Sequence, residues 1–162
     1  NDMLRFVKGE ITQLENFGIS HLLTELRQVI EPQMTQYGLQ LIVHDLCETE
    51  SLMTDRQALC GAMLNLLENA MQASSPGDQI ILTSNLEEEN IVLSVHDDGP
   101  GIDAALQERL FEPFFTTRSE GTGLGLAIVR GVIQSMGGSV QINSSPDTGT
   151  EFVIRLPRNK GD

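Results

Sequence analysis

The sequence predicts an α+β fold, a two-layer sandwich in which a mixed sheet packs on helices. Three observations support this prediction: 162 residues suit one domain, helical and alternating hydrophobic patterns both occur, and the two are mixed along the chain rather than strictly alternating. Hydrophobic residues make up 40% and charged residues 20%, which excludes a disordered chain. The net charge of −13 argues against nucleic acid or an anionic membrane as the main partner.

The first residues are expected to be helical and to come from a separate element. Hydrophobic side chains recur at helical spacing over residues 1–14, and a chain that begins at Asn1 without Met is expected to be a fragment. We expect residues 1–14 to be the end of a truncated helix plus a linker. Residues 15–158 should form the globular domain, beginning with a short extended piece at 15–18, and residues 159–162 a tail.

Two helices and a strand are expected in the first half of the domain. Ser20 can cap a helix that runs to about Gln36, and Pro32 should kink or interrupt it. Leucine and valine then alternate over residues 39–43, as in a strand. The helix predicted over residues 54–74 has the most regular pattern, because its apolar residues fall on one side of a 3.6-residue wheel. The polar residues on its other side are Asn65, Glu68, Asn69 and Gln72.

The second half of the domain predicts a hairpin, a helix and two final strands. Apolar residues alternate over residues 80–84 and 91–95, which are joined by an acidic turn. A helix is expected from about residue 124 to 136, closed by two glycines. Period-two apolar residues then mark strands at 140–142 and 152–156. The total is about six short strands and three helices.

The two cysteines, Cys47 and Cys60, have neither the spacing nor the His neighbours of a metal site. We expect both to be buried as small hydrophobic side chains, as in a protein of the reducing cytoplasm. No apolar run approaches the roughly 18 residues that are needed to cross a bilayer. These features predict a cytoplasmic location.

Two polar motifs each allow a structural and a functional interpretation. Asn65 and Asn69 are four residues apart, so their amides project side by side from a helix in which Asn is a poor former. They are either a solvated polar face or ligands for Mg²⁺ that phosphates already hold. Asp97 ends a strand, and Gly99 and Gly101 follow it. This segment is either a tight acidic turn or a pocket whose carboxylate accepts an exocyclic amine such as that of adenine.

Two further segments have the composition of functional loops. Gly121, Gly123 and Gly125 precede a predicted helix, where they form either a flexible turn or a phosphate site made of free backbone N–H groups. Residues 111–118 hold three of the six Phe residues, beside Pro and Gly. A mobile flap that docks through its aromatic rings is favoured here over plain core.

Taken in this order, the motifs resemble the catalytic and ATP-binding domain of bacterial sensor histidine kinases. These kinases belong to the superfamily of gyrase, heat-shock chaperone 90 and mismatch-repair ATPases. The resemblance covers residues 15–157 and implies a Bergerat-type sandwich: a mixed sheet of about five to six strands on three helices, with ATP between helices and a lid. It rests on NLLENA at 65–70, DDGPG at 97–101, FEPFF at 111–115, GTGLGL at 121–126, and a closing Gly149-Thr150-x-Phe152.

The resemblance implies a magnesium and phosphate site around the predicted helix. Asn69 resembles the Mg²⁺ ligand, and Asn65 and Glu68 are expected to be catalytic beside it. Asn65 and Asn69 are also expected to bind the nucleotide. Arg118 is the candidate cation for the γ-phosphate, since Gln72 stands where many relatives carry a phosphate-binding Lys. The hydrolases of the superfamily have a water-activating Glu at the position of Asn65, so slow hydrolysis is expected while phosphoryl transfer is preserved.

The resemblance also implies an adenine site and a phosphate loop. Asp97 resembles the adenine-binding Asp, Gly99 and Gly101 its supporting glycines, and Thr150 a hydroxyl near the adenine. The other residues expected to bind the nucleotide are Phe115, Thr116, Thr117, Gly121, Thr122, Gly123, Leu124, Gly125 and Leu126.

The resemblance implies transfer of the γ-phosphoryl group of Mg·ATP to a His on an adjoining dimerisation domain, for relay to a response regulator. His21, His44 and His96 lack the context of a phosphoacceptor, so the acceptor is expected outside this chain. The full-length kinase should be a homodimer and this fragment a monomer. The alternatives are a nucleotide-sensing module without transfer, or a superfamily ATPase or serine kinase.

The short lid and the strings FEPFFTT and NAMQAS further resemble the nitrogen-regulation and flagellar sensor kinases, which signal to response regulators of the σ54-activator type. The string NDMLRFVKGE favours the flagellar kind.

Overall fold

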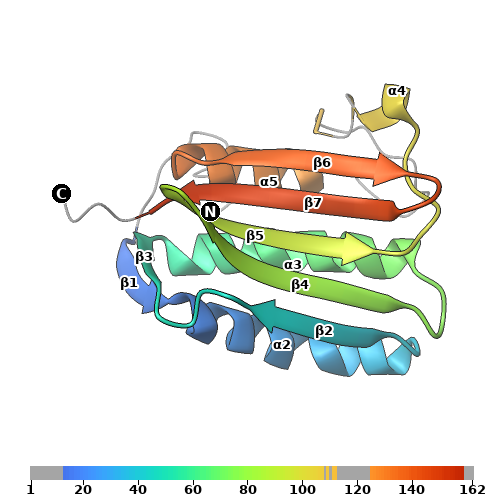
Figure 1. Cartoon of the computed structure of the whole chain (residues 1–162), viewed down its shortest axis with the longest axis horizontal. Coiled ribbons are helices and arrows are strands. Elements are labelled where there is room, and N and C mark those ends of the chain that lie inside the picture. The colour runs from blue at the N-terminus through green and yellow to red at the C-terminus, as the bar shows by residue number, and fades with distance from the viewer. Residues whose placement is uncertain (1–12, 108, 110, 113–124, 159–162) are drawn as a thin grey trace.

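The computed structural model describes residues 13–107, 109, 111–112 and 125–158. A five-stranded sheet of order β2-β4-β5-β7-β6 forms one layer, and helices α2, α3 and α5 lie along one face of it (Figure 1). The pair β2·β4 is parallel and the other pairs are antiparallel, while β1 and β3 form a separate antiparallel sheet. The described elements are β1 (Glu15–Gly18), α2 (Ile19–Gln36), β2 (Gln40–Asp45), β3 (Ser51–Thr54), α3 (Arg56–Ala73), β4 (Gln79–Glu87), β5 (Asn90–Asp97), α4 (Ala104–Gln107), α5 (Gly125–Ser135), β6 (Ser139–Ser145) and β7 (Gly149–Pro157).

The α+β two-layer sandwich predicted from the sequence is confirmed. Within the described residues the main sheet has five strands, and three helices of 11 to 18 residues cover it. Strand β3 was not predicted, because four residues with two apolar side chains give too short a pattern. No described helix combines the length and apolar character needed to cross a membrane. The predicted domain limits at residues 15 and 158 stay a prediction.

Helix α2 differs from the prediction at its start and at its proline. Its N-cap is Gly18, which has no side chain to cap with, and the Ser20 hydroxyl instead donates to the carboxylate of Asp45. Of the predicted kink or interruption at Pro32, the interruption is wrong, because one helix runs through this residue. Pro32 is exposed, so water can bond the carbonyl that loses its helical partner.

The helix predicted over residues 1–14 lies almost wholly outside the described residues. Its last two residues, Gln13 and Leu14, are described and are not helical. The reason is that Glu15 already pairs with Thr54 in the small sheet, so the chain must be extended when it arrives there.

The hydrophobic core lies between the sheet and the helices. Side chains on the inward face of the sheet alternate with outward ones at period two, while α3 contributes an apolar stripe. Fully buried members of this core include Leu59, Met63, Leu66, Leu67, Ile91, Leu93 and Ile154.

Both cysteine thiols are buried, as predicted. Burial is the largest cause that raises the pKa of the Cys47 thiol, and the nearby carboxylates of Asp45 and Glu50 raise it further. Burial likewise raises the pKa of the Cys60 thiol. Both groups are therefore poor nucleophiles in the folded chain.

A polar cluster around Asp45 joins α2, β2 and β4 at the end of the sheet that lies next to β1 and β3 (Figure 1). The Asp45 carboxylate accepts hydrogen bonds from the Ser20 hydroxyl, from the fully buried Ser84 hydroxyl at 2.7 Å and from the Cys47 backbone N–H at 3.0 Å. Burial raises the pKa of Asp45, but these three hydrogen bonds together outweigh it and lower the pKa below its ordinary value.

Replacing Asp45 by Asn is expected to lower the free energy of unfolding by about 1–2 kcal/mol at pH 7. A carboxyl whose pKa is depressed by folding contributes stability above its unfolded pKa, and this contribution is lost as pH falls through the folded pKa. The difference between parent and Asp45→Asn should therefore shrink below about pH 4. Urea unfolding at pH 7 and pH 3 measures both values; a difference that does not change with pH would contradict this account.

Candidate functional site

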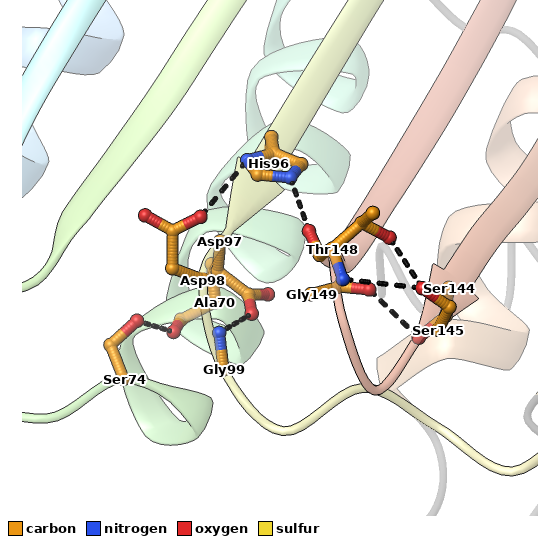
Figure 2. Close-up of polar contacts among 10 residues, drawn as sticks. All are labelled: Ala70, Ser74, His96, Asp97, Asp98, Gly99, Ser144, Ser145, Thr148 and Gly149. Atoms are coloured by element: carbon orange, nitrogen blue, oxygen red, sulfur yellow. Dashed lines mark hydrogen bonds and ion pairs between the residues drawn. The ribbon is translucent and has the colours of Figure 1, made fainter.

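The carboxylate of Asp97 lies at the C-terminal end of β5, the central strand of the sheet. Asp97 is only 4% exposed, and it pairs with Ile80 on one side and with Thr150 on the other. Its Oδ1 accepts a hydrogen bond from the Gly99 backbone N–H at 2.8 Å (Figure 2). Asp side chains are seldom buried to this extent, so Asp97 is the first candidate for a ligand-binding group.

The loop after Asp97 passes directly against the C-terminal end of α3. A Cβ atom added at Gly99 would come within 2.6 Å of the Ala73 carbonyl oxygen and 2.9 Å of the Asp97 Oδ1. A side chain at this position would therefore push the loop away from the helix and break the hydrogen bond that orients Asp97. Gly99 thus positions the carboxylate, while its role in supporting an adenine-binding Asp stays a prediction.

Helix α3 turns its two asparagines toward this loop. Asn65, Asn69 and Ala73 are spaced four residues apart, which places them on one face of the helix. Since Ala73 lies against Gly99, that face is the one next to the loop. Asn65 and Asn69 are half-buried, while Glu68 is exposed. The predicted metal ligand Asn69 thus lies one turn before the residue that packs against the predicted adenine-binding loop.

The turn between β6 and β7 forms the other side of the site. Gly149 begins β7 with φ of +81°, and a Cβ atom there would lie 2.0 Å from the Asp97 backbone oxygen. Gly101 packs against the same turn, since a Cβ atom on it would lie 2.4 Å from the Ser145 backbone oxygen. Both glycines are therefore required by contacts between protein segments.

Replacing Gly149 by Ala is expected to lower the free energy of unfolding by about 3–5 kcal/mol, because a positive φ and a main-chain overlap add up. Gly77→Ala is the matched control. Gly77 also has a positive φ, +94°, but a Cβ atom there meets nothing within 4 Å, so this change should lose only about 1–2 kcal/mol. Urea unfolding of both variants measures the two free energies of unfolding. Equal decreases would show that the contact with Asp97 does not contribute to stability.

Only the last two residues of the predicted phosphate loop, Gly125 and Leu126, lie within the described residues. Gly125 begins α5, a helix that packs against α3, and Leu126 is half-buried against the hydrophobic core. Leu126 therefore has a core position in addition to its predicted role. The predicted residues Phe115, Thr116, Thr117, Arg118, Gly121, Thr122, Gly123 and Leu124 lie outside the described residues.

Two residues that the sequence analysis did not assign to the site contact it. Figure 2 shows His96 with Nε2 2.8 Å from the Thr148 backbone oxygen and Nδ1 3.9 Å from Asp98. Because a carbonyl oxygen only accepts, Nε2 is the donor, and it ties β5 to the β6–β7 turn. Ser144 on β6 is the second, and its hydroxyl contacts Thr150 at 2.8 Å.

The fold and the site together define a class, the kinase-type ATP-binding domain. Its predicted architecture is a mixed sheet on three helices, and here a buried Asp ends the central strand beside a helix that carries two Asn residues. A family model described as "Histidine kinase-, DNA gyrase B-, and HSP90-like ATPase" matches residues 54–160. The chain belongs to this family, and the predicted membership is confirmed.

Curated relatives of this chain are sensor kinases. The signal transduction histidine-protein kinase AtoS of Escherichia coli is 33% identical over 158 residues, which are 97% of this chain and 26% of that protein. The sensor protein kinase FleS of Pseudomonas aeruginosa is 40% identical over 158 residues, 96% of this chain and 38% of that protein. The chain therefore spans about a quarter to two fifths of the length of these relatives.

Solved structures share the fold. The catalytic domain of histidine kinase ThkA superposes with a TM-score of 0.84 at 28% identity and covers 91% of this chain and 97% of that domain. Full-length ShkA in complex with AMPPNP gives 0.84 at 27% identity, covering 98% and 35%. ThkA in complex with response regulator protein TrrA gives 0.83 at 26% identity, covering 98% and 46%.

Proposed function

We propose that this domain binds Mg·ATP and transfers its γ-phosphoryl group to a His on an adjoining dimerisation domain, for relay to a response regulator. The observation that supports this most is the Asp97 carboxylate, buried at the end of the central strand, oriented by Gly99 and paired with Thr150. An ionised carboxylate only accepts hydrogen bonds, so it suits the exocyclic amine of adenine and disfavours a phosphate.

The phosphates would then lie along α3 toward the start of α5. Asn69 fits a magnesium ligand because its half-buried amide shares the helix face that meets the Gly99 loop. Among the described residues, no three His, Cys, Asp or Glu side chains are grouped to hold a metal. A cation here would need Asn69 together with phosphate oxygens, and it would neutralise charge on the phosphates during transfer.

The remaining catalytic assignments rest on the resemblance of the motifs. Asn65 lies one turn before Asn69, where it can orient the phosphates but offers no carboxylate to activate water, so hydrolysis should be slow. Glu68 is exposed, so its carboxylate is accessible to a group that approaches from solvent. Arg118, outside the described residues, is the proposed cation for the γ-phosphate. Phosphoryl transfer needs mainly such positioning and charge stabilisation.

The proposed partners come from the relatives. The complex of ThkA with TrrA supports a response regulator as a partner. The dimerisation domain with the acceptor His rests on the resemblance of the motifs. We further propose that the response regulator is of the σ54-activator type. The full-length kinase is proposed to be a homodimer whose catalytic domain lies in the cytoplasm, and this chain alone is proposed to be a monomer.

The test is transfer itself. The chain is incubated with γ-labelled ATP, Mg²⁺ and a separately produced His-containing helical hairpin from a relative such as FleS. Label on the hairpin that is lost in acid and retained in alkali is the expected result. ATP binding with an unlabelled hairpin would overturn transfer and leave a nucleotide-sensing module, acid-stable label would indicate a serine kinase, and rapid phosphate release would indicate an ATPase.

A further inference from the structure

A row of polar side chains crosses three strands at the site. The strand register places Asp97 opposite Thr150, and Thr150 opposite Ser144 on β6. Directly opposite residues point to the same face of a sheet, so this row shares the inward face with the apolar row Val95, Phe152 and Ile142 beside it. The inward face is thus apolar until its last row, where it becomes polar.

We infer that Ser144 is a positioning residue that fixes which way the Thr150 hydroxyl points, and thereby helps the site select adenine; this rests on the proposed function. The Ser144 hydroxyl meets three groups from separate segments. It accepts from the Ile102 backbone N–H at 2.7 Å, donates to the Gly149 backbone oxygen at 3.1 Å and contacts the Thr150 hydroxyl at 2.8 Å.

The single hydroxyl hydrogen of Ser144 decides which groups in this row donate hydrogen bonds and which accept them. A serine hydroxyl has one hydrogen to donate, and the Gly149 oxygen can only accept. With that hydrogen used, the contact between Ser144 and Thr150 requires Thr150 to be the donor. The Thr150 oxygen can then only accept from a ligand, and the Asp97 carboxylate beside it also only accepts.

Two neighbouring acceptors discriminate between purines. Adenine presents an amine at C6, which donates, whereas hypoxanthine and guanine present a carbonyl there, which accepts. A ligand carbonyl would meet Asp97 and Thr150 without a donor between them. Ser144 therefore acts through Thr150 and makes no contact with the nucleotide itself.

Ser144 also fixes the loop that leaves Asp97. Its hydroxyl accepts a hydrogen bond from the Ile102 N–H. The Gln107 side-chain amide donates to the backbone oxygen of Ile102 at 2.8 Å and to the backbone oxygen of Ser144 at 3.4 Å. Both backbone polar groups of Ile102 are thereby held, so the loop and the polar row keep one geometry.

The chain offers a matched control for this inference. Ser145 is the next residue. Within the described part of the chain, its hydroxyl forms hydrogen bonds only inside the β6–β7 turn, with the Thr148 hydroxyl at 2.7 Å and the Thr148 N–H at 3.2 Å. Ser145→Ala removes a hydroxyl from the same turn without touching the row. Ser144→Thr keeps a hydroxyl in a strand position that favours a β-branched residue.

The experiment measures the affinity of the chain for ATP and for inosine triphosphate by calorimetry. We expect Ser144→Ala to weaken ATP binding about fivefold to tenfold and inosine triphosphate binding much less, so that the ratio of the two affinities narrows. Ser144→Thr should restore the ratio, and Ser145→Ala should leave it unchanged.

Four results would overturn the inference. Equal weakening of ATP and inosine triphosphate binding in Ser144→Ala would show a purely structural role, and unchanged affinities for both nucleotides would show no role. In both cases ATP binding by the parent would leave the proposed function intact. A parent chain that binds both nucleotides equally would overturn the inference alone, whereas a parent chain that does not bind ATP would overturn the proposed function and the inference with it.

Discussion

ATP should bind the Asp97→Asn variant about tenfold to 150-fold more weakly than the parent. The Asp97 Oδ1 already accepts from the Gly99 N–H, so an amide that keeps this bond must place its NH₂ group where the second carboxylate oxygen was. A donor then faces the donating amine of adenine. Losing a charge-assisted hydrogen bond weakens binding by about 1.5–3 kcal/mol, which gives the expected range.

The control for this prediction is Asp98→Asn, which removes the same charge from the neighbouring, exposed residue. Calorimetry of both variants with Mg·ATP separates a specific contact from a general effect of charge. Asp98→Asn should bind within about twofold of the parent, since an exposed charge is screened by salt. Unchanged ATP affinity in a folded Asp97→Asn variant would show that Asp97 does not recognise adenine.

Asn69→Ala is expected to lose the part of ATP affinity that depends on Mg²⁺, and to lower phosphoryl transfer by at least about hundredfold. The metal stabilises charge that develops during transfer, a contribution of several kcal/mol. Adenosine, which has no phosphates, should bind the variant almost as well as the parent. The helix should survive, because Ala is a better helix former than Asn by a few tenths of a kcal/mol.

ATP titrations with Mg²⁺ and with a chelator measure this directly. Gln57→Ala is the control, since it exchanges an exposed amide for Ala in the first turn of the same helix, far from the Gly99 loop. If Asn69→Ala keeps the full Mg²⁺ dependence, Asn69 is not the ligand, and Asn65 or Glu68 takes its place as the candidate.

Much of the fold was predictable because its signals are local. The apolar stripe of α3 and the period-two residues of β5 and β7 each lie within one element, and the structure contains all three. The start of α2 was not predictable in the same way. Ser20 has the residue type of a helix cap, but its hydroxyl bonds to Asp45, 25 residues away, which only the tertiary fold determines.

The position of Asp97 was predictable because its motif lies at a structural boundary. Asp97 ends β5 and Gly99 follows in the loop, as the sequence predicts, while their roles toward a nucleotide stay a prediction. Ser144 and His96 act through residues far along the chain, so no motif includes them. A signal for Ser144 was present: the inward residues of β5, β7 and β6 each change from apolar to polar at one end, at Asp97, Thr150 and Ser144.

The location of the nucleotide is the central claim, and backbone amide resonances report it residue by residue. On titration of the chain with Mg·AMPPNP, the amides of Gly99, Ile102 and Thr150 should shift in proportion to occupancy. The amides of Leu46 and Cys47 should stay in place, because they follow β2 at the opposite end of the sheet (Figure 1). Shifts that cluster around Leu46 and Cys47, with Gly99 and Thr150 unmoved, would contradict the account.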